Sequence, residues 1–338
     1  MRLFAGLAAS AAAAAVAATA LAAPPPPPSP DRVAAAKAAS CPGPREAFTP
    51  LAVTLERLDV AKLRVRGAAD RFRISDAVRL RGDAPIGPVS AMGVLDEGFL
   101  FATRDGRWIR FDLDWNGPRV GALRNVASAP IRDRDGRPVS AGPTALWRVG
   151  DLQFAAFPGE GLVGAYGLDV CGATARRVGA FRTEPGAAAA SAIAVTDYSY
   201  GFFAGYDGDR LVTAAMNYAD FGVAAPTPLK LSQTEVTGPG GGRLAAIANP
   251  LVLVPMGLLS LWDVPEGTAL REFDLPQYMH FGSREPTKDR DLFVLEGFRP
   301  AAIWGTYDSR AKLSVVFLVV HDETTRDPVL LILEVDAE

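Results

Sequence analysis

Three features of the sequence carry side chains that could do chemistry. Glu296 lies inside the apolar run FVLEGF at 293–298, and because an unpaired buried carboxylate is costly, an acid there indicates either a partner or a function. His321 and Asp322 place a histidine and an acid side by side, as proton transfer requires. A histidine beside apolar strands also fits a structural role. The only other histidine is His280, so the sequence excludes a histidine-rich metal cluster.

The third feature is the segment Arg104-Asp105-Gly106-Arg107, which separates two strand-like stretches within residues 93–117. An Asp-Gly step tolerates the positive φ that a tight hairpin turn requires, so the segment predicts a hairpin. Asp105 therefore has a structural explanation as well as a chemical one. Arg104 and Arg107 flank it and add two cations that are suited to binding an anion.

Other catalytic patterns are weaker. The run Asp112-x-Asp114-x-Asn116-Gly117 has the opening spacing of a calcium loop, but Leu123 stands where the bidentate Glu is expected, so we interpret it as a turn. A Gly-x-Ser-x-Gly nucleophile elbow is absent from the sequence. The glycines at 240–242 lack the lysine of a phosphate loop and indicate a flexible loop.

These residues must be positioned by a β-rich fold. Short strand-like runs recur along the chain, among them LQFAAF, RLVTAAMN, LLSLWDV, LSVVFLVVHD and VLLILEV, with Gly- and Pro-containing turns between them. Many short strands at such spacing predict an all-β sandwich, barrel or propeller. A single sandwich or small barrel leaves much of the chain unused, so we predict an all-β propeller of about six blades, within a range of five to seven.

The N-terminal residues predict export. Arg2 precedes an uncharged run of small and apolar residues that ends near Ala22, which is the layout of a secretory signal peptide at 1–22. A retained membrane anchor is the alternative, although alanine is weakly apolar and the run ends in prolines. We expect a Pro/Ala-rich linker at 23–50, the propeller domain at 51–338, and a secreted, periplasmic protein.

Cysteine content and charge limit the partners. The two cysteines, Cys41 and Cys171, predict one disulfide in an oxidising compartment, with two free thiols as the alternative. The formal net charge is −3 and the basic residues form no stripe, so nucleic acid is not an expected partner. No apolar stretch after the signal peptide is long enough to cross a bilayer. We expect a monomer that binds a small-molecule ligand or a phosphoester.

Two groups of motifs resemble a known family. The first contains Gly87, Ser90, Gly106-Arg107-Trp108 and the turn at 133–138, and the second contains LEGFRPAAI at 295–303 and the segment at 315–335. Their order resembles the phytase-like secreted proteins described as having esterase-like activity of phytase. The resemblance implies a propeller that hydrolyses phosphoesters or esters with the help of a metal ion.

The resemblance also implies roles for individual residues. Carboxylates would hold Ca²⁺, which polarises phosphoryl oxygens, and arginines would bind the phosphates. The implied catalytic residues are Asp105, Glu296 and Asp322, of which Glu296 and Asp322 would also be metal ligands. The implied substrate-binding residues are Arg104, Arg107 and Arg299.

Two departures from the family pattern support a second hypothesis. The order of Arg104 and Asp105 is reversed, and a shift by one position turns a strand side chain to the opposite face. The segment 141–145, AGPTA, has no acid where the family has two. The alternative is therefore a non-catalytic propeller that binds a ligand or a protein partner. Whether Asp105, Glu296 and Asp322 converge on one cation distinguishes the two hypotheses.

Overall fold

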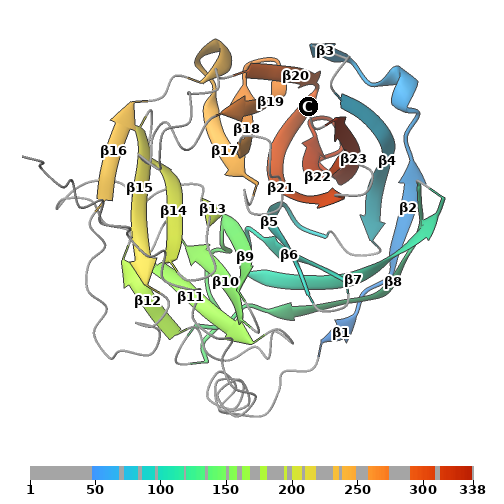
Figure 1. Cartoon of the computed structure of the whole chain (residues 1–338). Helices are drawn as coiled ribbons and strands as arrows, with labels where there is room; N and C mark the ends of the chain where they lie inside the picture. The colour runs from blue at the N-terminus through green and yellow to red at the C-terminus, as the bar shows by residue number, and fades with distance from the viewer. Residues whose placement is uncertain are drawn as a thin grey trace, which may run out of the picture.

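The chain forms a β-propeller, as the sequence predicts. The computed structural model describes residues 48–67, 72–82, 86–95, 98–117, 119–133, 136–149, 152–157, 162–167, 176–180, 194–195, 200–207, 210–217, 231–235, 238–248, 258–273, 290–308 and 313–336. These residues form five antiparallel sheets of four or five strands, which follow one another around a ring (Figure 1). Five is the lower end of the predicted range of blades.

We number the blades by the chain order of their innermost strands. Blade 1 contains β5 (Val89–Val94), β6 (Phe99–Thr103), β7 (Arg107–Asn116) and β8 (Arg119–Pro130). Blade 2 contains β9 (Ala145–Val149), β10 (Leu152–Phe157), β11 (Leu162–Gly167) and β12 (Arg176–Ala180). Blade 3 contains β13 (Ala194–Val195), β14 (Tyr200–Asp207), β15 (Arg210–Asn217) and β16 (Leu231–Glu235).

The last two blades complete the ring. Blade 4 contains β17 (Arg243–Ile247), β18 (Leu258–Val264), β19 (Gly267–Phe273) and β20 (Arg290–Glu296). Blade 5 contains β21 (Phe298–Asp308), β22 (Leu313–Asp322), β23 (Pro328–Asp336) and, from the N-terminal part of the chain, β4 (Phe72–Gly82). Two short 3₁₀ helices, η1 (Val60–Lys62) and η4 (Pro239–Gly241), are the helical elements of the described residues.

Residues 49–67 form an N-terminal strap along the outside of three blades. Its strands β1 (Thr49–Pro50), β2 (Val53–Arg57) and β3 (Val65–Gly67) each add a fifth strand, to blades 1, 5 and 4 respectively. The strap follows the outer rim of the ring in blue (Figure 1). Because hydrogen bonds of one segment join three blades, the strap holds the two sides of the ring closure together.

Blade 5 closes the ring by pairing strands from distant parts of the chain. β4 pairs antiparallel with β23, with Val78 opposite Leu330 and Phe72 opposite Val335. The run LSVVFLVVHD of β22 is apolar on both faces, as expected for a strand covered on both sides. Both ends of the described chain therefore contribute to the same sheet.

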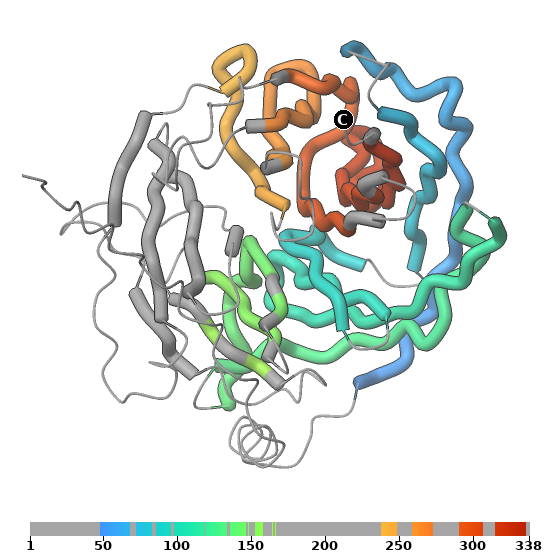
Figure 2. Tube along the Cα trace, viewed as in Figure 1, coloured from blue at the N-terminus to red at the C-terminus, as the bar shows by residue number. Residues whose placement is uncertain are grey.

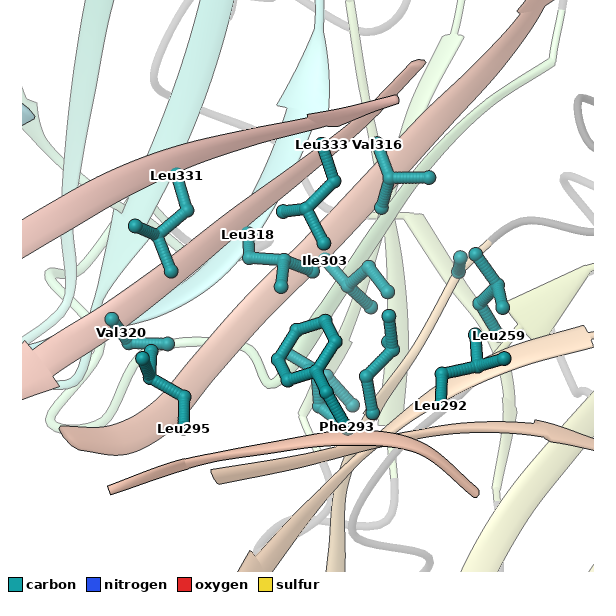
Figure 3. Packing of buried hydrophobic residues seen from close by; sticks show 14 of the residues in the cluster. Leu259, Leu292, Phe293, Leu295, Ile303, Val316, Leu318, Val320, Leu331 and Leu333 are labelled. Atoms are coloured by element: carbon teal, nitrogen blue, oxygen red, sulfur yellow. The ribbon is translucent and has the colours of Figure 1, made fainter. Parts of the chain in front are cut away.

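The core lies between neighbouring blades. In β22, Val316, Leu318 and Val320 face blade 4, while Phe317 and Val319 face blade 1. Figure 3 shows the first three beside Phe293 and Leu295 of β20. This alternation follows from the two-residue repeat of a strand, and it joins each blade to the next by apolar contacts on both faces.

A buried acid bridges blades 5 and 1. Asp76 of β4 is 2% exposed, accepts a 2.8 Å hydrogen bond from the backbone N–H of Val120 in β8, and forms an ion pair with Arg57 of the strap. Arg57 also donates to the carbonyl oxygen of Val120 at 2.6 Å. The carboxylate is therefore a structural group that joins two blades and the strap, since a buried side chain of this kind requires hydrogen-bond partners and finds them there.

The hairpin predicted in residues 93–117 is confirmed. β6 and β7 are joined by a turn at 104–106, where Gly106 has a φ of +78°. The acidic run at 112–117 forms the end of β7 and the turn into β8: Asn125 donates to Asp112, and Arg124 forms an ion pair with Asp114. Its acids are thus engaged by the neighbouring strand.

Several sequence predictions fall outside the described residues. They are the signal peptide at 1–22, most of the linker at 23–50, Cys41, Cys171 and His280. Strand pairing already begins at Thr49, which lies opposite Ser128. Among the described residues, the structure contains no helix long and apolar enough to cross a membrane.

Candidate ligand-binding cleft

A small cavity lies among the innermost strands of four blades. The innermost strands β5, β9, β17 and β21 surround it, and its volume is about 10 Å³. Apart from Thr144, its lining side chains are apolar, among them Met92, Leu146 and Ile303. The carboxylates expected to converge on a central channel do not line this space.

A much larger cleft lies at the seam between blades 5 and 1. Its volume is about 860 Å³. The traces of the two blades lie side by side in Figure 2. Blade 5 contributes Gly82, Arg299 and residues 321–323 and 325–328, and blade 1 contributes 86–88 and Arg104. The cleft is therefore built from the loops that enter β5 and β23, from the start of β21 and from the turn between β6 and β7.

Asp322 organises the turn between β22 and β23. Its Oδ1 accepts hydrogen bonds from the backbone N–H groups of Thr324 and Thr325, at 2.8 and 3.2 Å. The backbone N–H of Arg326 donates to the carbonyl oxygen of Asp322 at 2.7 Å. This use of an aspartate side chain to cap its own turn is a common role for Asp.

A buried arginine fixes the other oxygen of the same carboxylate. Arg79 of β4 approaches Asp322 Oδ2 at 2.6 Å, and the two side chains are only 13% and 14% exposed. Burial raises the pKa of the Asp322 carboxyl, but the hydrogen bonds from the turn and from Arg79 outweigh burial and hold the pKa below its ordinary value. Asp322 is therefore a charged structural acid with both oxygens occupied.

Arg299 and Glu323 form a second ion pair at the cleft. Arg299 Nη1 donates to Asp263 Oδ1 at 2.9 Å and to the carbonyl oxygen of Val264 at 2.7 Å, and its Nε lies 2.5 Å from Glu323 Oε1. The hydrogen bond to Asp263 is the main cause that raises the pKa of Arg299, so the guanidinium stays charged. Arg299 joins blade 4 to the turn that Asp322 organises.

Arg104 differs from Arg299, because its side chain has no hydrogen-bond or ion-pair partner in the part of the chain that the structure describes. Its backbone is fixed on both sides: the N–H donates to Pro88 at 2.8 Å and the carbonyl oxygen accepts from Gly142 at 3.0 Å. The backbone thus holds the residue at the cleft and leaves the guanidinium available to a ligand.

His321 lies at the floor of the cleft and is 9% exposed. Its Nε2 lies 3.1 Å from the carbonyl oxygen of Val89, so Nε2 carries the proton. Burial lowers the pKa of His321; the hydrogen bond to Val89 acts in the opposite direction, and the positive charge of Arg104 lowers the pKa further. The imidazole is neutral and joins β22 to β5.

The neutral state of His321 predicts a pH dependence of stability. Below the ordinary histidine pKa of 6.5 the unfolded chain takes up a proton that the folded protein resists, so the free energy of unfolding falls as the pH decreases. Asp322 does not affect stability in this range. Because its pKa is lowered in the folded protein, its contribution to the free energy of unfolding decreases only when the pH falls below 3.8, the ordinary pKa of Asp. Urea unfolding from about pH 7.5 to about pH 5 measures the effect.

A His321→Gln variant is the control for this prediction. The glutamine amide can still donate to Val89 but does not titrate, so we expect a smaller loss of stability over the same pH range. Equal slopes for the two proteins would assign the pH dependence to other groups.

The remaining predicted residues lie outside the lining of the cleft. Glu296, at the end of β20, forms ion pairs with two arginines of the strap: its Oε1 lies 2.7 Å from Arg66 Nε and its Oε2 lies 3.6 Å from Arg64 Nη1. Asp105 lies on the turn beside Arg104, with its carboxylate against Gly87. Arg107 donates to the hydroxyl of Ser128 in β8. The cleft thus brings together Arg104, Arg299 and Asp322 of the six predicted residues.

The predicted calcium site requires several carboxylates on one cation. Within the described residues, no group of three or more His, Cys, Asp and Glu side chains is arranged to hold a metal ion. Asp322 and Glu296 are each held by arginines instead. This arrangement fits structural roles for both acids.

Two residues at or behind the cleft have almost no signal of their role in the sequence. Arg79 lies in a strand-like run with ordinary alternation, and nothing in that run indicates a partner 243 positions away. Arg326 lines the cleft with a φ of +63°. Its place in the closing turn, between Asp322 and Pro328, was the only signal available.

Comparison with known proteins adds shape alone. The chain matches no protein-family model and no curated protein. Solved structures of similar shape include a nidogen/laminin complex, with a TM-score of 0.41 and 10% identity over 82% of this chain and 92% of that chain. A protein from Lactobacillus plantarum has a TM-score of 0.35 and 12% identity over 78% of each chain. The computationally designed Ika8 protein has a TM-score of 0.32 and 12% identity over 82% of this chain and 81% of that chain.

Proposed function

We propose that this chain is a ligand-binding β-propeller whose cleft between blades 5 and 1 takes a small anion with phosphoryl or carboxylate oxygens. One observation carries the proposal. Arg104 and Arg326 line the cleft without an ion-pair partner among the described residues, whereas each carboxylate of the cleft lies near another arginine. These two guanidinium groups are therefore available to an anion.

The carboxylates of the cleft are engaged by other arginines. Asp322 is paired with Arg79, Glu323 with Arg299, and Asp327 lies 3.8 Å from Arg81. These acids do not need the two remaining arginines. A guanidinium matches the geometry of phosphate and carboxylate groups with two parallel donors, so two unpaired arginines favour an anion.

The same pairing favours binding over metal-assisted hydrolysis. A hydrolase of the phytase-like type, which the resemblance in sequence predicts, would need carboxylates free to hold a cation. Here Asp322 and Glu323 are occupied by arginines and by the backbone of their own turn. Phosphoester hydrolysis remains the alternative function, and Ca²⁺-dependent release of phosphate would support it.

Substitution of Arg104 tests the proposal. Isothermal titration of the full chain at low salt with phytate, inorganic phosphate and citrate should detect binding of at least one probe. We expect Arg104→Gln to weaken that binding about tenfold, because one charge-assisted contact is lost. Added salt should weaken the binding of the unaltered protein as well.

Arg119→Gln is the matched control. Arg119 is an exposed arginine at the turn between β7 and β8, at the opposite end of blade 1 from the cleft. Its loss changes the net charge by the same amount and should leave affinity almost unchanged. Equal losses in the two variants would indicate attraction by net charge, and absence of binding for all three probes would refute an anion site.

A further inference from the structure

The backbone of Arg326 is unusual. Its φ of +63° lies in the left-handed region, where side chains with a Cβ are disfavoured. In the described part of the chain, Asn125 is the only other residue besides glycine with a positive φ. Backbone strain of this kind persists where the surrounding structure enforces it, and it is enriched at functional sites.

The turn between β22 and β23 imposes this conformation. Asp322 caps Thr324 and Thr325, its carbonyl oxygen accepts from Arg326 N–H at 2.7 Å, and its own N–H donates to the carbonyl oxygen of Asp327 at 3.1 Å. The buried pair with Arg79 attaches the turn to β4. A glycine at position 326 would adopt this backbone conformation without strain.

The positive φ of Asn125 has an ordinary explanation. Asparagine tolerates the left-handed region better than other side chains, and Asn125 also donates to the carboxylate of Asp112. Arg326 has neither explanation. Arginine is not a residue suited to this backbone, and its side chain has no partner within the described residues although it borders an 860 Å³ cleft.

We infer that Arg326 is a specificity-determining residue of the cleft, which the turn holds in a strained backbone so that its guanidinium meets a second anionic group of the ligand. The inference rests on the proposed anion site. Arg104, on the turn of blade 1, provides the first contact, and Arg326, on the turn of blade 5, faces the same cleft from the other side of the seam. A ligand with two or more anionic groups can contact both turns at once and gains affinity from both contacts. A single phosphate has only one anionic group and does not gain affinity from the second turn.

The variant Arg326→Gly separates function from stability. Glycine removes the charge and also relieves the backbone, so the urea midpoint should rise or stay constant while the affinity for phytate falls about tenfold. The affinity for inorganic phosphate should change much less, because one arginine contact suffices for it. The preference for phytate over phosphate is the quantity that a purely structural role would not alter.

Two further variants complete the test. Asn125→Gly relaxes the other left-handed residue, which does not line the cleft, and it should leave both affinities unchanged. Arg326→Asn keeps a side chain that tolerates this backbone but removes the charge, and it should lose the preference as Arg326→Gly does.

The outcomes are distinguishable. If the unaltered chain binds phytate and Arg326→Gly binds it with the same preference over phosphate, the role of Arg326 is overturned and the anion site stands. If the unaltered chain binds none of the anions, the site and the role of Arg326 both fail. If Arg326→Gly lowers the urea midpoint, the backbone strain at this position is not relieved by glycine and the argument from strain is wrong.

Discussion

Replacing Asp76 with alanine is expected to lower the free energy of unfolding by about 1–3 kcal/mol, the cost typical of leaving a buried hydrogen-bonding group without its partner. The carboxylate accepts from the backbone N–H groups of Val120 and Ala77 and pairs with Arg57. Without it, the buried Val120 N–H loses its acceptor at the seam of blades 5 and 1. Urea unfolding followed by tryptophan fluorescence measures the loss.

Asp114→Ala is the matched control for this prediction. Asp114 also lies on a strand and pairs with an arginine of its neighbour, Arg124, but the two side chains are 35% and 68% exposed. Exposed pairs contribute about 0–1 kcal/mol, so a small change is expected. Comparable losses for Asp76→Ala and Asp114→Ala would contradict a special role for the buried acid.

Gly142→Ala is expected to destabilise the chain by about 2–3 kcal/mol through overpacking, and to weaken anion binding as well. A Cβ at position 142 would lie 1.8 Å from the carbonyl oxygen of Thr103, so the connection to β9 must move away from the turn between β6 and β7. The N–H of Gly142 also donates to the carbonyl oxygen of Arg104, which the movement would release. Unfolding in urea and titration with phytate report the two effects.

Gly121→Ala controls for the loss of a glycine. A Cβ there meets its nearest atom, the carbonyl oxygen of Asp114, at 3.4 Å, which is an ordinary contact. That substitution should be neutral or slightly stabilising, because alanine restricts the unfolded chain. If Gly142→Ala behaved like Gly121→Ala, the close packing of the connection against the turn would be disproved.

The sequence predicted the local elements well because their causes are local. Asp105 and Gly106 fixed a hairpin by the φ that a glycine permits, and the turn is found there with Gly106 at +78°. The run at 313–322 is apolar on both faces, and it forms a strand buried between two blades. Fold class follows from many such elements, since each blade repeats the same short-range pattern.

Partners distant in the chain were beyond sequence reasoning. For Glu296 the sequence predicts either a partner or a function, and nothing near it indicates that Arg64 and Arg66 of the strap are its ion-pair partners. Segment 72–82 is a strand from the N-terminal part of the chain, yet it joins the last blade. Such pairings form when the ring closes. The composition of a single strand does not indicate which distant strand it will pair with.

The candidate site was predicted in part for the same reason. Arg104, Arg299 and Asp322 were selected from two separate parts of the chain, and the structure brings them to one cleft. Asp322 is held in an ion pair only because Arg79 lies beside it in the folded protein. The left-handed backbone of Arg326 arises because the turn has an arginine at a position that suits a glycine. Neither property has a signature in residue type or spacing.

The closure of blade 5 also sets the order in which the molecule can fold. Arg73 and Glu334 lie on paired strands although they are 261 positions apart, so β4 has no inner partner until the last strand of the chain has been synthesised. Contacts between such distant segments form slowly, and an unpaired strand edge invites pairing with another chain. Before β23 has formed, one edge of β4 is therefore unpaired. At this stage of folding, protection by chaperones competes with aggregation through that edge.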